Sequence, residues 1–370
     1  MVRVGVVGGG IAGLLTALNL LKYFDVDLYE VFPKVGYRKH CTGVVSLITA
    51  HECLGKDFID NYFNKLIIRL GSLRAELYSS TPFACRLSRV KHEVYLSNLI
   101  KGLGGKVLLK HRVLKVIKSS RGYELIVKCP DSIVRRFTYD YVVITEGYPS
   151  RLSRELGFKP VTEVLVGAQY RVKLRKALSD SLVNTLIVNY CIDSTCGFTW
   201  FTPLSRREAL VGIATKYYVG NELIGVLNKL TKAIAKTLRT DYEVKDLFGG
   251  YVLRGYPKEL VRGRVIALGD TNTTTKPVSG GGIYPILKTA KQVTKQLSKG
   301  ELTNGVGEEV IKELKKQYMI YETVSRLRNA LSKLRISIQT KITPQQYDQH
   351  QTLIANILKQ NVSLLSIKLK

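Results

Sequence analysis

The sequence has 370 residues, of which 45% are hydrophobic and 23% are charged, and these values exclude a disordered or fibrous chain. At roughly 150 residues for each domain, the length predicts two or three domains. Lysines and arginines number 57 against 29 aspartates and glutamates, which gives a net charge of +28. This excess of positive charge gives no information on the fold, but it indicates anionic partners such as membranes, nucleic acids or phosphorylated ligands.

The first elements in the chain form a βαβ pattern. Residues 2–7 have the composition of a buried strand, and the leucines between Ile11 and Leu21 follow helical spacing. A second strand is predicted over residues 26–31. The uncharged run Val4–Leu21 resembles a signal peptide or a membrane span in length, but its clustered glycines favour a tight turn.

The turn between the first strand and the helix has the sequence Gly8-Gly9-Gly10-Ile11-Ala12-Gly13. In this pattern Gly8 permits the sharp turn, Gly10 lets a pyrophosphate approach the backbone, and Gly13 lets the helix pack closely on the strand. The helix N-terminus offers free N–H groups to phosphates. Glu30, at the end of the second strand, can accept hydrogen bonds from ribose hydroxyls. The sequence therefore predicts a dinucleotide site, and Glu30 argues against a 2′-phosphate there.

The elements that follow indicate an inserted sheet domain. A helix is predicted near residues 92–103, followed by strands near 106–118, 123–128 and 133–144. Several longer strands are expected within 161–218, then a helix at 221–238 and a strand at 261–270 that returns to the first domain. Residues 283–370 are expected to be mainly helical, with an interruption at Pro344.

Two features of the sequence bear on partners and compartment. Residues 101–136 hold ten lysines and arginines against two acidic residues, which indicates either a solvated sheet face or a strip that faces a membrane or a partner. None of the six cysteines forms a CxxC pair, so neither a metal site nor a redox dithiol is expected. Cys191 and Cys196 are close enough in sequence to pair, but a reduced chain is the expectation.

Five further blocks, together with Gly8–Glu30, carry a resemblance to a known family. The blocks are Cys41-Thr42-Gly43, Ser88-Arg89, Thr145–Ser150, Phe198–Pro203, and Gly269-Asp270 followed by Lys276–Tyr284. Over most of residues 1–300 the chain resembles the geranylgeranyl reductase family, which consists of flavoproteins with the p-hydroxybenzoate hydroxylase type of FAD fold. It departs from the family pattern at Glu146 and Ser88, where aspartate is usual, and in the threonines after Asp270.

The resemblance implies FAD as the cofactor and a set of residues around it. Asp270 is expected beside the ribityl–phosphate region, and the glycine run 280–282 beside the isoalloxazine ring. The implied cofactor-binding residues are Gly8, Gly10, Ala12, Gly13, Glu30, Arg89, Gly147, Asp270, Gly280, Gly281, Gly282 and Ile283. The implied substrate-binding residues are Phe198, Trp200, Pro203 and Tyr284. Cys41 is the catalytic candidate, as a proton donor or a substrate-shaping group, with a small buried hydrophobe as the alternative.

These observations predict an α/β fold with a Rossmann-like FAD-binding domain, an inserted antiparallel-sheet substrate domain and a helical C-terminus. The expected boundaries are 1–155 and 256–300 for the two parts of the FAD-binding domain, 156–255 for the inserted domain and 301–370 for the helical region. An archaeal enzyme of lipid biosynthesis is the type that the resemblance implies.

The expected activity is reduction of C=C bonds in a polyprenyl chain on a lipid or quinone, by hydride transfer from flavin N5. The alternative is a flavin-dependent monooxygenase acting on a small or apolar substrate. Only one dinucleotide fingerprint is present, so electrons are expected from a ferredoxin, a flavodoxin or loosely bound NAD(P)H. We expect a cytoplasmic protein, peripheral to the inner face of an anionic membrane, in which the apolar residues Leu353, Ile354, Ile357 and Leu358 add a hydrophobic contact. Nucleic acid is the least favoured partner.

Overall fold

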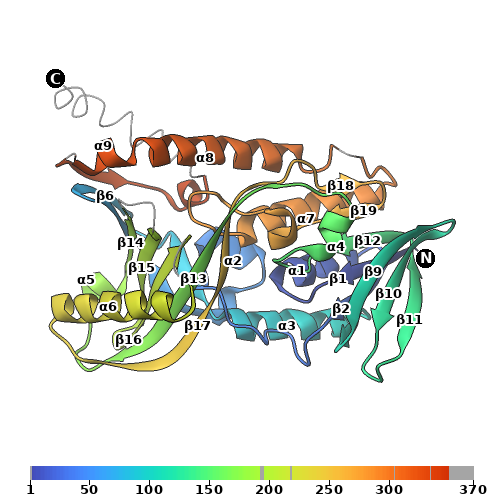
Figure 1. Cartoon of the computed structure of the whole chain (residues 1–370), viewed down its shortest axis with the longest axis horizontal. Coiled ribbons are helices and arrows are strands. Elements are labelled where there is room, and N and C mark those ends of the chain that lie inside the picture. The colour runs from blue at the N-terminus through green and yellow to red at the C-terminus, as the bar shows by residue number, and fades with distance from the viewer. Residues whose placement is uncertain (1, 192–195, 217–218, 304, 334, 350–370) are drawn as a thin grey trace. The chain divides into compact units, whose positions relative to one another are not determined.

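A computed structural model of the chain describes residues 2–191, 196–216, 219–303, 305–333 and 335–349 (Figure 1). The described residues form two compact units. Unit 1 draws on residues 1–38, 89–163 and 253–318, and unit 2 on residues 39–88, 164–252 and 319–370. The predicted segment 1–155 is thus divided between the units, because residues 39–88 belong to unit 2.

Unit 1 is built around a six-stranded sheet with the order β18-β19-β12-β1-β2-β8. The central strand β1 pairs in parallel with β2 on one side and β12 on the other. Because β1 is buried on both faces, its sequence is a continuous apolar run rather than an alternating one. The strand bounds are Arg3–Val7 for β1, Asp25–Glu30 for β2, Lys106–Leu109 for β8, Tyr141–Ile144 for β12, Val261–Arg262 for β18 and Val265–Ala267 for β19.

Helices pack on one face of this sheet and a smaller sheet packs on the other. Helix α1 (Ile11–Leu20) contacts β1, β2, α3 (Arg89–Gly102) and α7 (Ile283–Ser298). The opposite face is covered by the antiparallel sheet of β9 (Arg112–Ser119), β10 (Gly122–Lys128) and β11 (Val134–Tyr139), which shares a hydrophobic core with it. The short helices α4 (Arg151–Glu155) and η2 (Gly269–Asn272) follow β12 and β19, and α8 (Glu308–Arg326) begins in this unit.

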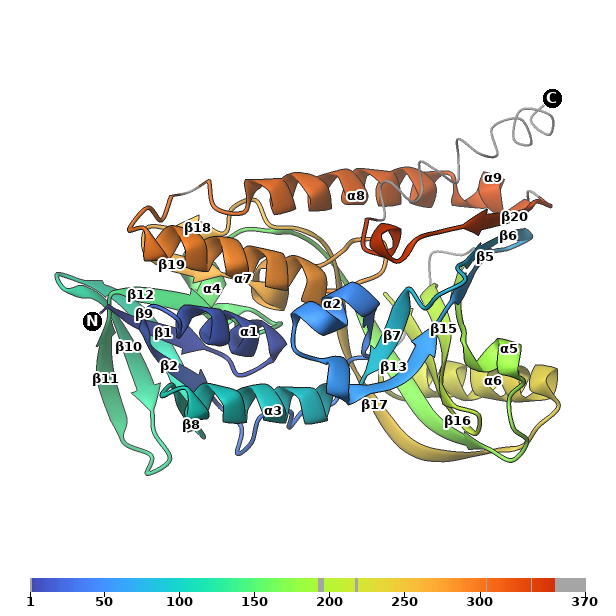
Figure 2. The same ribbon diagram turned by 180° about the vertical axis from the view of Figure 1, so that it is seen from behind.

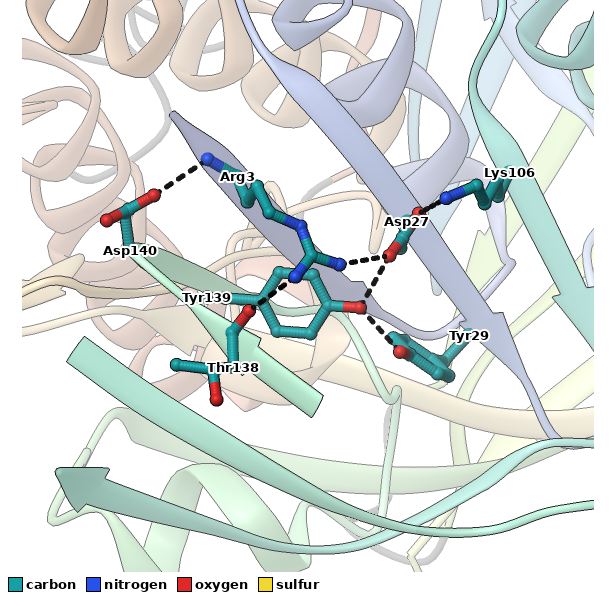
Figure 3. Close-up of polar contacts among 7 residues, drawn as sticks. All are labelled: Arg3, Asp27, Tyr29, Lys106, Thr138, Tyr139 and Asp140. Atoms are coloured by element: carbon teal, nitrogen blue, oxygen red, sulfur yellow. Dashed lines mark hydrogen bonds and ion pairs between the residues drawn. The ribbon is translucent and has the colours of Figure 1, made fainter. Parts of the chain in front are cut away.

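A buried polar network lies between β2 and β11 (Figure 3). The Asp27 carboxylate accepts hydrogen bonds from the Arg3 guanidinium at 3.1 Å and from the Tyr139 hydroxyl at 2.7 Å. The hydroxyls of Tyr139 and Tyr29 lie 2.5 Å apart, and the Lys106 ammonium is 3.7 Å from the second carboxylate oxygen. Burial raises the pKa of both tyrosine hydroxyls, so both remain protonated.

Unit 2 is built on an eight-stranded sheet with the order β17-β13-β16-β15-β14-β5-β6-β20. Helix α6 (Gly220–Leu238) packs its apolar face on β13 and β16. The strands are β5 (Lys65–Leu70), β6 (Leu73–Tyr78), β13 (Val161–Leu174), β14 (Thr185–Tyr190), β15 (Cys196–Ser205), β16 (Glu208–Thr215), β17 (Tyr242–Tyr256) and β20 (Ser337–Lys341).

Smaller elements complete unit 2. A three-stranded sheet has the order β3-β7-β4, with β3 at Val44–Ser46, β4 at Ile59–Phe63 and β7 at Ala84–Leu87. The helices are α2 (Leu47–Glu52), η1 (Lys56–Phe58), α5 (Asp180–Val183), α9 (Arg328–Lys333) and η3 (Pro344–Tyr347).

The C-terminal region is not entirely helical, although α8 and α9 confirm a mainly helical part. Residues 337–341 form β20, which pairs in parallel with β6 (Figure 2). The burial of β20 alternates along the strand because only one of its faces covers the core. The predicted apolar contact at Leu353–Leu358 lies outside the described residues.

Two further expectations are addressed by the structure. Cys191 is disulfide-bonded, which corrects the expectation of a fully reduced chain, whereas Cys41, Cys53, Cys85 and Cys129 are thiols. Among the described residues, no helix combines the length and the apolar character needed to cross a membrane.

Candidate functional site

The glycine-rich turn joins β1 to α1 with no room for side chains at two positions. Gly8 has φ +108°, and a Cβ there would lie 2.3 Å from the carbonyl oxygen of Thr145 on the neighbouring strand. A Cβ at Gly13 would lie 1.9 Å from the carbonyl oxygen of Gly8. The turn is therefore as tight as the sequence predicts, and only glycine fits at Gly8 and Gly13.

The N-terminus of α1 is open in front of this turn. Its N-cap residue is Gly10, and no side chain accepts a hydrogen bond from the first turn of the helix. No heavy atom lies within 4 Å of a Cβ built at Gly10, or of one built at Gly147 at the end of β12. Uncapped N–H groups beside open space fit a bound phosphate, which would accept their hydrogen bonds and interact with the helix dipole.

Glu30 closes the other side of the turn. Its carboxylate accepts a hydrogen bond from the Gly9 amide at 2.7 Å and another from the Phe32 amide at 2.8 Å, and the residue is 8% exposed. Burial raises the pKa of this carboxyl group, while the backbone hydrogen bonds lower it. Each carboxylate oxygen has a second lone pair, so ribose hydroxyls could still donate to it. Glu30 thus has a structural role in the turn that its position in the sequence does not reveal.

Glu146 links three segments next to this site. Its carboxylate accepts a hydrogen bond from the Ser153 amide of α4 at 3.0 Å and from the Thr271 hydroxyl of η2 at 3.4 Å. Burial raises the pKa of Glu146. The longer side chain at this departure from the family pattern therefore connects the segment after β12 to α4 and η2, and a Cβ at the adjacent Gly147 would meet no atom within 4 Å.

Asp270 is held beside α1 by the glycine that precedes it. Gly269 has φ +77°, and a Cβ there would lie 2.8 Å from the Cβ of Ala12. Asp270 lies in the first turn of η2, directly after the glycine that packs on Ala12. The threonines that follow are buried; the hydroxyls of Thr273 and Thr162 in β13 lie 2.5 Å apart, and the Thr275 hydroxyl donates to the Leu253 carbonyl in β17 at 3.0 Å.

The glycine run forms a closed loop before α7. The Lys276 amide donates to the Gly281 carbonyl at 2.9 Å, and the Gly280 amide donates to the Lys276 carbonyl at 2.8 Å. The Lys276 side chain is 6% exposed, and its ammonium lies 5.8 Å from the ring centre of Tyr284. Gly282 is the N-cap of α7 and Ile283 its first residue, so the run also ends at a helix N-terminus without a side-chain cap.

Arg89 is the first residue of α3. Its guanidinium forms an ion pair with Glu93 one turn further along α3. Burial is the main cause of the raised pKa of Glu30, and the negative charge of Glu93 also contributes to it. The contacts of Arg89 thus include a partner within its own helix.

In unit 2, Gln169 joins the Cys41 segment to the sheet. The Gln169 side-chain oxygen accepts hydrogen bonds from the Trp200 indole at 3.2 Å and from the Thr42 hydroxyl at 3.1 Å. Its amide nitrogen donates to the His40 carbonyl at 3.4 Å. Gln169 is 1% exposed and was not among the predicted site residues. The only signal in the sequence is a single amide among the apolar residues of β13.

An aromatic wall lies on the same face of this sheet. Trp200 packs on Gly212, where a Cβ would lie 2.1 Å from the indole ring, and the rings of Phe198 and Trp200 are 5.4 Å apart. Cys41 is partly exposed, and its sulfur accepts a hydrogen bond from the Gly43 amide at 3.3 Å. Pro203 is buried further along β15. The structure thus brings Cys41, Phe198 and Trp200 into one unit, whereas Tyr284 belongs to unit 1.

Comparisons with known proteins place this geometry in context. No family model matches the chain. A curated relative, the digeranylgeranylglycerophospholipid reductase of Methanospirillum hungatei, is 24% identical over 315 residues, which cover 80% of this chain and 76% of the relative.

Solved structures share the fold over nearly the whole chain. A geranylgeranyl bacteriochlorophyll reductase-like protein from Thermoplasma acidophilum has a TM-score of 0.78 at 20% identity, covering 98% of this chain and 100% of that one. A flavin-dependent brominase has a TM-score of 0.73 at 13% identity, with 96% and 93% covered. A p-nitrophenol 4-monooxygenase from Pseudomonas putida has a TM-score of 0.64 at 18% identity, with 95% and 93% covered.

These findings confirm the predicted fold class, an FAD fold of the p-hydroxybenzoate hydroxylase type with a helical C-terminus. The Gly8–Glu30 motif forms the strand, turn and helix that such a fold requires, and the sequence relative carries the reductase name that the motifs predict. The chain therefore resembles the geranylgeranyl reductase family both in sequence and in fold.

Proposed function

We propose that the chain is an FAD-dependent oxidoreductase that saturates C=C bonds of a polyprenyl chain carried by a lipid or a quinone. The observation that supports this most directly is the uncapped N-terminus of α1 between Gly8 and Gly13, beside the carboxylate of Glu30. This arrangement fits the pyrophosphate and ribose of a dinucleotide. The similarity to a curated reductase supports the substrate class.

The residues of unit 1 would hold the cofactor. The first turn of α1 would bind the pyrophosphate, Glu30 the ribose hydroxyls, and Asp270 the ribityl side. The backbone at Gly280, Gly281 and Gly282 would admit the flat ring, and the cationic side chain of Lys276 lies against Gly281. When bound and reduced by the electron donor, FAD would supply a hydride equivalent to one alkene carbon. Protein groups position the alkene, exclude water and supply the proton for the neighbouring carbon.

The residues of unit 2 would receive the substrate. Phe198 and Trp200 would provide an apolar wall for an isoprenoid chain, with Pro203, and Tyr284 of unit 1, as further candidates. Cys41 is proposed as the proton donor or as a group that shapes the pocket. A Cys41→Ser variant keeps a polar hydrogen and Cys41→Ala removes it, so loss of turnover only in Cys41→Ala supports the donor role.

The partners follow from the chemistry and the charge. An acidic ferredoxin or flavodoxin, or NAD(P)H, would supply the electrons, and the net charge of +28 would accelerate docking of an acidic carrier. A polyprenyl lipid resides in a bilayer, so the protein would work in the cytoplasm at the inner face of the membrane.

The test has two parts. The purified protein should be yellow and contain one FAD, and a colourless protein that takes up no FAD on titration would contradict the cofactor assignment. Cells that express the chain should contain lipids or quinones with two added hydrogens for each saturated bond, measured by mass spectrometry against cells with a Gly13→Asp variant.

The alternative is a flavin-dependent monooxygenase, which the fold shared with p-nitrophenol 4-monooxygenase favours. It predicts NADPH oxidation that produces hydrogen peroxide and a hydroxylated product, with unchanged prenyl lipids. Mass spectrometry of the same extracts distinguishes the two activities, since one adds oxygen and the other adds hydrogen.

A further inference from the structure

A basic hollow in unit 2 has no role in the proposed reaction. It has a volume of about 780 Å³ and lies where the end of β13, the β15–β16 turn and the C-terminal end of α6 meet. Its charged lining consists of Arg175, Lys176, Arg207, Lys236, Arg239 and Asp241. Five cationic side chains against one carboxylate give the hollow a net charge of +4.

The carboxylates around the hollow do not neutralise it. Glu208 forms its ion pair with Arg171, and Asp180 forms its ion pair with Arg206, neither of which lines the hollow. Glu243 forms an ion pair with Lys245. The hydrogen bond with Lys245 lowers the pKa of Glu243, and the nearby charges of Lys173 and Arg175 lower it further.

The backbone that carries these cations is fixed by hydrogen bonds between the elements. The Arg207 guanidinium donates to the Arg175 carbonyl at 3.0 Å, and the Arg175 amide donates to the Asp241 carbonyl at 3.0 Å. The Lys176 amide donates to the Thr240 hydroxyl at 2.9 Å. These hydrogen bonds hold three segments that are distant in sequence in fixed positions relative to one another. Ala177 and Ala235 complete part of the lining, and their small side chains leave the space open.

We propose that this hollow binds a phosphate-bearing group with at least two negative charges, such as a diphosphate or a phosphate monoester. Guanidinium groups match phosphate oxygens with paired hydrogen bonds, and ammonium groups add charge without a geometric requirement. The hollow is open to solvent, so a charged ligand would reach these side chains directly. The site is separate from the phosphate site predicted at α1 and does not depend on the proposed redox activity.

The experiment uses the full chain with and without an excess of FAD, so that pyrophosphate binding in the hollow is measured separately from any binding at the N-terminus of α1. Titration calorimetry with inorganic pyrophosphate at constant ionic strength should give saturable binding to one site. The variant Arg175→Ala/Lys236→Ala should weaken binding on the order of tenfold or more, because it removes charge-assisted hydrogen bonds. The matched control is Lys229→Ala/Lys232→Ala, which removes the same charge from exposed positions of α6 outside the hollow.

Two sources of the phosphate group are separated by a second arm of the experiment. Vesicles that contain phosphatidic acid are compared with phosphatidylglycerol vesicles of equal surface charge. Stronger binding to phosphatidic acid that disappears in Arg175→Ala/Lys236→Ala identifies a lipid headgroup, whereas binding of pyrophosphate alone identifies a soluble ligand. The proposal is overturned if neither probe binds saturably, or if the control variant loses as much affinity as the hollow variant.

Discussion

Glu30 combines a structural and a predicted cofactor-binding role in one carboxylate. In Glu30→Ala the amides of Gly9 and Phe32 lose their acceptor, so the turn in front of α1 should loosen. We expect FAD affinity to fall on the order of tenfold or more, and the free energy of unfolding to fall by about 1–3 kcal/mol. Flavin fluorescence titration and urea denaturation measure the two effects. The control is Glu124→Ala, on the β9–β11 sheet. If Glu30→Ala retained FAD as well as the wild type does, the assignment of Glu30 to the cofactor site would be wrong.

The raised pKa of Glu30 predicts a pH dependence with opposite signs for stability and for binding. Burial raises the pKa of Glu30 above the ordinary 4.5, so the protonated carboxyl group stabilises the folded apo-protein. This contribution to the free energy of unfolding is fully present below pH 4.5 and is lost as the pH rises through the folded-state pKa. Ribose hydroxyls donate best to the ionised form, so FAD affinity should increase over the same interval. Glu30→Gln should flatten the affinity profile there. An unchanged slope in this variant would assign the titration to another group, such as Glu146.

A substitution in the buried network between β2 and β11 tests whether a change on one face of the unit 1 sheet affects FAD binding on the other face. Tyr139→Phe removes the hydroxyl that donates to Asp27 and contacts Tyr29, and should cost about 1–2 kcal/mol in the free energy of unfolding. Because α1 packs on the other face, FAD affinity should change less than twofold or so. Urea denaturation and FAD titration check both, with the exposed Tyr251→Phe as the control. A large loss of FAD affinity would show that the faces are coupled.

An element could be predicted well where the residues that stabilise it lie close to it in the sequence. The β1–α1–β2 unit was predicted almost to the residue, since its glycines, its apolar spacing and Glu30 all lie within 30 residues. By contrast, β5 and β6 were not identified, and β20 was expected to be helical. Strands β5 and β6 pair with each other across the short Gly71-Ser72 turn, a local hairpin pattern that our predicted elements did not include. Their other partners, β14 for β5 and β20 for β6, are distant in sequence. Gln169 was missed for the same reason, because its partners Thr42 and Trp200 come from other segments.

The charge of the whole molecule, +28, exceeds what any single site requires. A polyprenyl substrate is too apolar to reach a flavin through water, so the proposed function requires the protein to take it from a bilayer. Lysines and arginines close to an anionic surface contribute about 1 kcal/mol each, so a handful that face the membrane would give reversible binding. The basic stretch 101–136 is one source of such residues, including Arg112, Lys115 and Lys128 on exposed positions of β9 and β10.

We therefore predict that the protein co-sediments with phosphatidylglycerol vesicles, that the bound fraction increases with anionic lipid, and that it decreases with salt. Screening sets the scale of the salt effect, because the Debye length falls from about 10 Å at 0.1 M to about 3 Å at 1 M. Many separate cations contribute to this attraction, so removing two of them at the basic hollow should change it only slightly, unlike the binding of pyrophosphate. If the protein co-sediments with neither neutral nor anionic vesicles at low salt, the membrane proposal is wrong. That result would favour a soluble substrate, as in the monooxygenase alternative.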